Sequence, residues 1–300
     1  MIKKVFVFSI LFVSMLFFSQ ENLAAEDLSK LPVINAENYK KYFKIFHFEG
    51  DAAQHPTAKV TVPDGYKVIG GGARVNWEKV CPRRGNLLTS SYPSDDSKSW
   101  IATSQDHTAG NECPCTITVW AIAIWDPKDL FEVESFSDQT PIAESHPSLT
   151  KSVPPEYVMT CGGAQVIGSE NMLTASFPEN HSTWKAMSKD HRISGPAKIK
   201  VYAIGIKLRR GGKYFENMLD FKTSKVKNHP IKTVSIGKKY VLSGGGARAN
   251  WANPNLGQLL TASYPNDSHT WRAKSKEHID SSPASITVFA IGIKKIGEPH

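Results

Sequence analysis

The chain contains one unit of about 80 residues three times, and this triplication constrains its fold more than any other feature. Each copy carries a glycine-rich segment, an aromatic-proline pair, a tryptophan seven positions ahead of a histidine, and a closing apolar segment. The glycine-rich segments read YKVIGGGAR from Tyr66, YVMTCGGAQ from Tyr157 and YVLSGGGAR from Tyr240. The closing segments read ITVWAIAI from Ile117, IKVYAIGI from Ile199 and ITVFAIGI from Ile286.

Apolar residues recur with a period of two within each copy, which is typical of β-strands. The segment Trp184–Lys189, for example, puts Trp, Ala and Ser on one face and Lys, Met and Lys on the other. We therefore expect an all-β fold of three tandem units of about 80 residues, built as small sandwich-like modules packed together. A single pseudo-threefold β-prism, with one sheet per repeat, is the alternative. The predicted units are repeat 1 (26–126), repeat 2 (127–207) and repeat 3 (208–300).

The glycine-rich segments do not predict a phosphate-binding loop. Such a loop joins a strand to a helix and carries a lysine at a set spacing, whereas here an alanine and more strand follow. A bulge or a close approach of the backbone inside a sheet is the better interpretation. The three repeated tryptophans are expected in the core: Trp100, Trp184 and Trp271.

The N-terminus has the pattern of a secretory signal peptide. Lys3 and Lys4 precede an apolar stretch of 14 residues, Val5–Phe18, and small residues follow at Ala24 and Ala25. This stretch is shorter than the ~20 residues of a membrane-spanning helix. We expect cleavage after Ala25, so that residues 1–25 are removed and the chain is secreted to the extracellular space or the periplasm.

The formal net charge of +8 is distributed unevenly along the chain. Residues 26–181 carry a net charge of −7, and residues 182–300 carry +14. The basic part predicts an anionic partner, such as an acidic glycan or an envelope polymer. Nucleic acid is disfavoured, because an exported chain without a nucleic-acid-binding module is not expected to meet it. The predicted anionic-partner patch comprises Lys185, Lys189, Arg209, Arg210, Arg272, Lys274 and Lys276.

Two further sets of polar residues are candidates for ligand binding. The loop after each aromatic-proline pair is rich in Asp, Glu and Asn, which either form turns or make a hydrogen-bonding rim for sugars. An Arg-x-Asn-Trp motif in repeats 1 and 3, absent from repeat 2, suits stacking on carbohydrate with polar recognition beside it. The predicted ligand-binding residues are Arg74, Asn76, Trp77, Asp95, Asp96, Glu179, Asn180, Arg248, Asn250, Trp251, Asn266 and Asp267.

Cysteine and histidine positions predict one disulfide and no metal site. Cys81 is expected to pair with Cys113 or Cys115, since all three lie in loops of repeat 1 and the chain is expected to be exported. A zinc site formed by these three cysteines, or by the histidine that follows each repeated tryptophan, is the less favoured interpretation. Neighbouring lysines oppose a cation beside the histidines. No cofactor is predicted.

The GGGA, aromatic-Pro, Trp and TVxAI pattern resembles tandem β-repeats of secreted bacterial proteins whose function is not established. This resemblance implies export and β-structure but no site residues. No catalytic constellation is recognisable in the sequence, and three near-copies suit a multivalent binder better than an enzyme. We therefore expect an exported, non-enzymatic binding protein for carbohydrate or anionic surface polymers. The alternatives are a toxin or membrane-active component and a self-associating matrix or coat protein.

Overall fold

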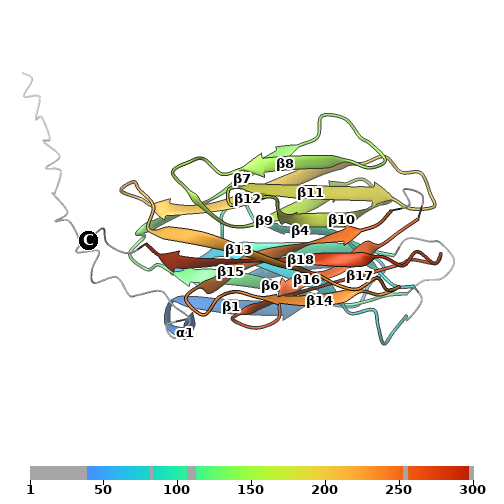
Figure 1. The fold of residues 1–300 in the computed structure, drawn as a ribbon, viewed down its shortest axis with the longest axis horizontal. Helices are drawn as coiled ribbons and strands as arrows, with labels where there is room; N and C mark the ends of the chain where they lie inside the picture. Colours follow the sequence, from blue (N-terminus) through green and yellow to red (C-terminus); the bar gives the residue numbers. More distant parts are fainter. Residues whose placement is uncertain (1–38, 82–83, 107–112, 253–255, 297–300) are drawn as a thin grey trace, which may run out of the picture. The chain divides into compact units, whose positions relative to one another are not determined.

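The structure is a computed structural model that describes residues 39–296 except 82–83, 107–112 and 253–255, so the predicted signal peptide lies outside the described residues. Six strands form each repeat, and a short helix, α1 (Tyr39–Tyr42), precedes the first (Figure 1). Repeat 1 contains β1 (Phe43–Glu49), β2 (Thr57–Thr61), β3 (Tyr66–Val75), β4 (Leu87–Pro93), β5 (Ser99–Gln105) and β6 (Ile117–Trp125). Repeat 2 contains β7 (Phe131–Gln139), β8 (Ser148–Ser152), β9 (Val158–Ile167), β10 (Asn171–Pro178), β11 (Thr183–Asp190) and β12 (Lys198–Leu208). Repeat 3 contains β13 (Phe215–Thr223), β14 (Ile231–Ser235), β15 (Val241–Asn250), β16 (Leu259–Pro265), β17 (Thr270–Lys276) and β18 (Ser285–Lys295).

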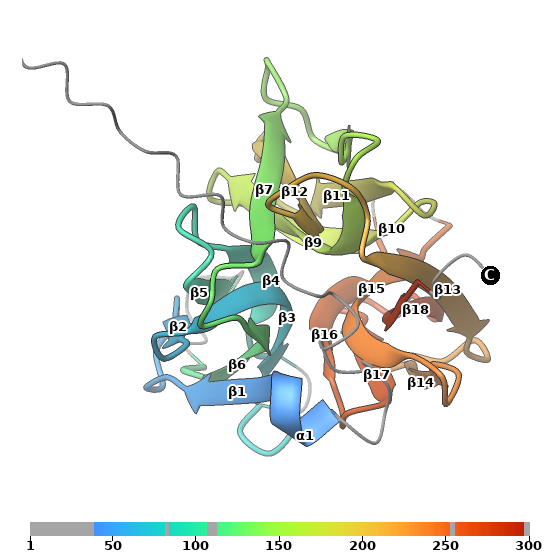
Figure 2. The same ribbon diagram turned by 90° about the vertical axis from the view of Figure 1, so that its left-hand side faces the viewer.

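Three six-stranded antiparallel sheets are formed, and each combines strands from two repeats. Their strand orders are β1-β6-β3-β16-β17-β14 (sheet I), β2-β5-β4-β9-β12-β7 (sheet II) and β13-β18-β15-β10-β11-β8 (sheet III). Figure 2 shows the three sheets around a common centre. The all-β class and the three tandem units are confirmed, whereas the sharing of every sheet between two repeats was not predicted.

Each repeat is a two-layered unit whose layers belong to different sheets. In repeat 3, β15 and β18 lie in sheet III and β16 and β17 lie in sheet I. Trp271 fills the space between these layers, and a Cβ on Gly245 of β15 would lie 2.5 Å from its Cγ. The indole nitrogen of each repeated tryptophan donates to a serine Oγ on the neighbouring strand at 2.9 Å, in the pairs Trp100–Ser91, Trp184–Ser176 and Trp271–Ser263. The predicted core role of the three tryptophans is confirmed.

The three repeats meet along a pseudo-threefold axis. The glycine-rich strands β3, β9 and β15 approach one another there, and a Cβ on Gly244 would lie 2.6 Å from both Cβ and Sγ of Cys161. Thr160 Oγ1 donates to the carbonyl of Ile69 at 2.6 Å, and Ser243 Oγ donates to that of Thr160 at 2.9 Å. These contacts join all three repeats, and they explain the glycines as sites of close backbone approach. The equivalent residues Leu87, Met172 and Leu259 form a second buried cluster.

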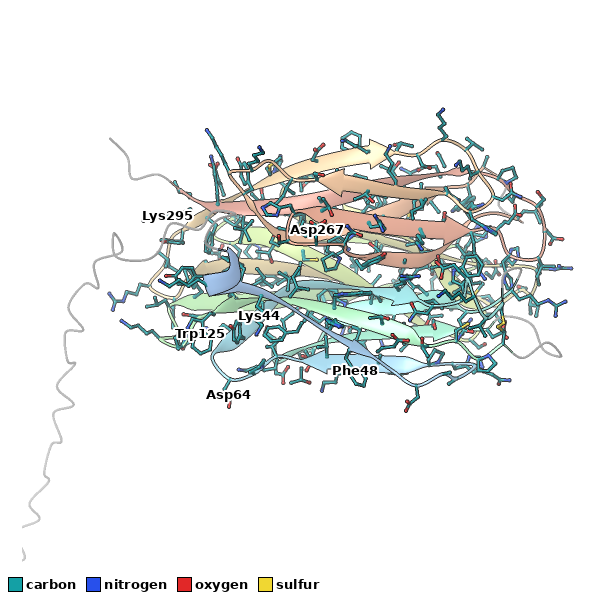
Figure 3. All side chains as sticks on the ribbon, turned by 90° about the horizontal axis from the view of Figure 1, so that it is seen from below. Lys44, Phe48, Asp64, Trp125, Asp267 and Lys295 are labelled. Carbon is teal, nitrogen blue, oxygen red and sulfur yellow. A yellow bond between two sulfur atoms is a disulfide. The ribbon has the colours of Figure 1, made fainter. Side chains whose placement is uncertain are left out.

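One disulfide joins the two long loops of repeat 1. Cys81 pairs with Cys113, with 6.3 Å between their Cα atoms, whereas Cys115 is a free, buried thiol. In Figure 3 the disulfide lies at the end of the strands opposite to Trp125 and Lys295. Among the residues that the structure describes, no helix is long and apolar enough to span a membrane.

Candidate functional site

Two stacked aromatic rings recur at the same place on the outer face of each sheet. On sheet I, Trp120 stacks on Tyr264 with ring centroids 4.6 Å apart and an interplanar angle of 20°. The equivalent pairs are Tyr202–Tyr92 on sheet II, at 5.3 Å and 17°, and Phe289–Phe177 on sheet III, at 4.9 Å and 23°. We call these three the outer aromatic pairs. Each pair takes one ring from each of two repeats, so it exists only because the repeats share sheets.

A glycine in the strand between the two rings makes each pair possible. On sheet II, Gly163 of β9 lies between Tyr202 and Tyr92, and a Cβ there would lie 2.8 Å from Tyr92 Cα. The equivalent glycines are Gly72 and Gly246, so the last glycine of each run leaves room for the two flanking rings to meet above it. One ring of each pair is buried and the other is partly exposed. The partly exposed ring of sheet I, Trp120, alternates with the fully buried Val119 and Ala121, which shows that it points outward.

The residue beside each outer aromatic pair differs from sheet to sheet. Arg272 lies opposite Tyr264 on sheet I, Lys185 lies opposite Phe177 on sheet III, and Ile101 lies opposite Tyr92 on sheet II. Two of the three faces therefore place a cation next to the rings. The structure thus brings predicted residues of both classes together: Arg74 with Arg272 and Lys274 on sheet I, and Arg248 with Lys185 on sheet III.

Glu78 binds two of the cations on sheet I. Its carboxylate accepts from Lys274 Nζ at 2.6 Å and lies 3.4 Å from Arg74 Nη2. Burial alone would raise the pKa of the Glu78 carboxyl, but the hydrogen bond and the charge from Lys274, with the charge of Arg74, hold it below its usual value. Arg272 has a different partner, since its Nε donates to Thr233 Oγ1 at 3.0 Å.

The tryptophans of the Arg-x-Asn-Trp motif are covered by lysines of a neighbouring repeat. Trp77 is only 4 % exposed, and Lys276 Nζ lies 4.3 Å from its ring centroid while donating to the carbonyls of Gly85, at 2.8 Å, and Arg84. Lys189 Nζ covers Trp251 in the same way, at 4.7 Å, and donates to the carbonyl of Leu256. The prediction of an exposed sugar platform is therefore wrong for Trp77, and Trp251 keeps only part of its surface.

Lys189 and Lys276 were also predicted to belong to the anionic-partner patch, and this prediction is wrong, because both side chains are fully buried. Lys276 lies on the same face of β17 as Arg272 and Lys274, but the loop after β3 covers the end of the strand at Lys276. Burial lowers the pKa of Lys276 to about 7 and that of Lys189 to about 8. A cation held against an aromatic face in a desolvated site gains about 2 kcal/mol, which offsets part of this cost.

Repeat 2 lacks the motif tryptophan, and the residue that contacts it from repeat 1 is not a lysine. In repeat 1, the position of Lys189 and Lys276 is taken by Gln105, whose side chain contacts repeat 2. Gln105 Nε2 donates to the carbonyl of Ser169 at 2.5 Å and lies 3.3 Å from Met172 Sδ. A lysine thus occurs only where the next repeat supplies an indole ring to cover it.

The asparagines of the same motif have structural partners. Asn76 Nδ2 donates to Thr116 Oγ1 and Thr118 Oγ1, both at 2.9 Å, and lies 3.2 Å from Glu49 Oε1. Asn250 Nδ2 donates to Ser285 Oγ at 3.1 Å and to Thr287 Oγ1 at 2.9 Å. The amide of Asn76 thus links the end of β3 to β6, and that of Asn250 links the end of β15 to β18.

The polar loops between the hairpin strands form turns, which was one of the two predicted interpretations. Asp96 accepts from the backbone N–H of Lys98 at 3.0 Å, Asn180 from that of Ser182 at 2.9 Å, and Asp267 from that of His269 at 2.8 Å. Asp95, Glu179 and Asn266 are exposed beside them, and Asp267 is labelled in Figure 3. The pKa of Asp96 is lowered by its hydrogen bonds from Ser94 and Lys98.

The remaining cations of the predicted patch lie elsewhere. Arg209 and Arg210 follow β12 in an exposed turn, where Arg209 Nη2 binds Asp129 Oδ1 at 2.8 Å. This ion pair ties the turn after β12 to the start of repeat 2, so Arg209 is already engaged within the protein. The structure does not gather the predicted patch into one surface.

The histidines considered as metal ligands are brought together in part. His191 and His278 are buried, with ring centroids 5.7 Å apart, and His191 Nε2 donates to the carbonyl of His278 at 2.8 Å. His107, the equivalent residue of repeat 1, lies outside the described residues. Of the two cysteine pairings left open, the structure selects Cys81 with Cys113, and burial raises the pKa of the free Cys115 thiol.

Sequence reasoning missed the ring that the closing segment supplies to each outer aromatic pair: Trp120, Tyr202 and Phe289. Each is the aromatic residue in the fourth position of the closing segment, in ITVWA, IKVYA and ITVFA. An aromatic at the same place in all three copies, between residues of the buried face, was the available signal. Its stacking partner could not be inferred, since it comes from another repeat. No known family model matches the chain, and a search of curated proteins finds no relative of it.

Proposed function

We propose that the protein is an exported, non-enzymatic and multivalent binding protein for carbohydrate or anionic surface polymers. The outer aromatic pairs carry this proposal, because a stacked pair recurs at an equivalent place on all three sheets. A core contact would be satisfied by rings buried on both sides, whereas here one ring of each pair keeps part of its surface exposed.

The chemistry of these positions suits saccharides. A flat aromatic ring offers apolar surface to the C–H face of a sugar, and polar side chains beside it bind hydroxyl or acidic groups. A cation stands next to the rings on sheet I, at Arg272, and would bind carboxylate or sulfate groups. A polymer that engages two faces gains avidity from the second contact without any stronger single contact.

A glycan array combined with heparin chromatography tests the proposal on the mature protein. We expect array binding, and elution from heparin above physiological salt. An empty array together with elution below physiological salt would overturn the proposal.

A matched pair of variants separates the sites from general surface effects. Replacing the partly exposed ring of each pair by alanine, at Trp120, Tyr92 and Phe289 together, should abolish array binding. Phe48→Ala is the control, because Phe48 is a 51 % exposed aromatic on the edge strand β1 that belongs to no outer aromatic pair. Equal loss of binding in both proteins would contradict the assignment.

A further inference from the structure

The three outer faces differ in which charges remain available to a ligand. Lys185, beside the pair on sheet III, forms an ion pair with Glu179 at 3.0 Å, and the equivalent position on sheet II is the apolar Ile101. On sheet I, Lys274 and Arg74 share Glu78. Among the residues that the structure describes, no carboxylate lies within ion-pair distance of Arg272, whose Nε binds the neutral hydroxyl of Thr233.

We infer that the outer face of β6, β3, β16 and β17, the cationic face, is a binding site for an acidic oligosaccharide. One sugar ring stacks on Trp120, and a carboxylate or sulfate group on another sugar of the same oligosaccharide binds the guanidinium of Arg272. This inference rests on the proposed function and narrows it to one ligand class on one of the three faces.

The strand register places the two contacts on one line across the sheet. Trp120 pairs with Gly72 of β3, and Tyr264 of β16 pairs with Arg272 of β17. Neighbouring strands lie about 4.8 Å apart, so the backbones of β6 and β17 are separated by roughly 14 Å. A ligand that touches both side chains therefore extends beyond a single ring and runs across the strands rather than along them.

Arg272 suits the acidic group better than the neighbouring cations do. A guanidinium binds a carboxylate or sulfate through two parallel hydrogen bonds, which adds geometric specificity to charge. Lys274 would first have to release Glu78, and that carboxylate would repel an incoming anion near Arg74. The acidic group is thus directed to the β17 end of the cationic face.

The site also depends on closure of the ring of repeats. Trp120 and Gly72 belong to repeat 1, and Tyr264 and Arg272 belong to repeat 3, so the site forms only where β3 pairs with β16. A fragment that lacks either repeat is therefore not a valid test, and the whole mature chain is required.

The test compares Arg272→Gln with Lys185→Gln, which makes the same change at the equivalent position of sheet III. Affinity is measured by calorimetry for a sulfated glycosaminoglycan oligosaccharide, for its chemically desulfated form and for its monosaccharide. R272Q should weaken binding of the sulfated oligosaccharide about tenfold or more, as loss of a charged hydrogen bond does. K185Q should remain within about twofold of the unaltered protein. Trp120→Ala should weaken binding as R272Q does, and the monosaccharide should bind far more weakly than the oligosaccharide.

The outcomes separate this inference from the proposed function. If the unaltered protein binds no glycan on the array, the proposed function fails. If it binds glycans but R272Q and K185Q lose affinity equally, or the desulfated and sulfated chains bind equally, the inference is overturned while the proposed function stands. Thermal melting of each variant checks folding. Arg272→Lys keeps the positive charge but lacks the two parallel N–H donors of a guanidinium, so its affinity should lie between those of R272Q and the unaltered protein.

Discussion

Replacing Lys276 by methionine removes a buried amine while retaining most of the volume that it fills. In the folded protein the pKa of this lysine is lowered from 10.5 to about 7 by burial, which disfavours its charged form. In the unfolded chain the amine keeps its ordinary pKa. Between these two values the unfolded state therefore binds more protons than the folded state, and the free energy of unfolding must rise with pH.

The magnitude follows from the two pKa values. Between pH 7 and 8.5 the contribution of Lys276 to the free energy of unfolding should increase by roughly 1.5 kcal/mol. Lys189, whose pKa is lowered to about 8, adds a smaller rise of the same sign. Above about pH 8.5 thiols of the unfolded chain ionise. The pKa values of Cys115 and Cys161 are raised by burial, so these two residues act with the opposite sign there. The interval from pH 7 to 8.5 is therefore the clearest window.

Urea unfolding at several pH values across this window provides the measurement. The unaltered protein should gain stability as the pH rises, and Lys276→Met should keep only the smaller rise due to Lys189. The double variant K189M/K276M should be nearly flat. The slope is the readout, because methionine also leaves the carbonyl of Gly85 without its donor. An unchanged slope in K276M would refute the reasoning.

Three further changes should alter stability in directions that the structure determines. Ile279→Gly should raise the free energy of unfolding by about 1 kcal/mol, since a β-branched residue is strained at a φ of 67° and this side chain is 43 % exposed; a lower urea midpoint would contradict this. Gly246→Ala should cost about 1–3 kcal/mol through overpacking, because its Cβ would lie 2.6 Å from Phe177 Cα, whereas Gly237→Ala, with Met218 Sδ at 3.7 Å, should be nearly neutral in the same melting assay. Removing the disulfide with C81S/C113S should cost about 3–4 kcal/mol in denaturant titrations, as expected for a cross-link between cysteines 32 residues apart, and an unchanged midpoint would show that the link does not constrain the unfolded chain.

The sequence predicted what depends on local pattern. Alternation along Trp184–Lys189 correctly identified the buried tryptophan face, and the repeated glycines correctly indicated close backbone approach. The same alternation placed Lys189 on an exposed face. It failed there because a loop of repeat 3, which carries Trp251 and Leu256, folds over the end of that strand. Contacts between repeats have no local signature in a single copy.

The outer aromatic pairs were hidden for a related reason. Tyr264 and Trp120 are each visible as repeated aromatics, but they are more than 140 positions apart in the chain and meet only where β16 and β3 share a sheet. The exchange of strands between repeats is set by tertiary packing, which periodicity within one repeat does not encode. The fold class was therefore accessible from the sequence, and the composition of each face was not.

The pairing of lysine and tryptophan around the axis makes the order of the repeats meaningful. Each lysine reaches the next repeat in a cycle, so a circular permutant would keep every contact. A chain in which repeats 2 and 3 were exchanged would instead direct Lys276 toward Gly168 and bury an ammonium group with no ring above it. Repeat 3 alone carries both partners, Trp251 and Lys276. Three identical copies of it would satisfy one another by rotation, as the subunits of a symmetric trimer do.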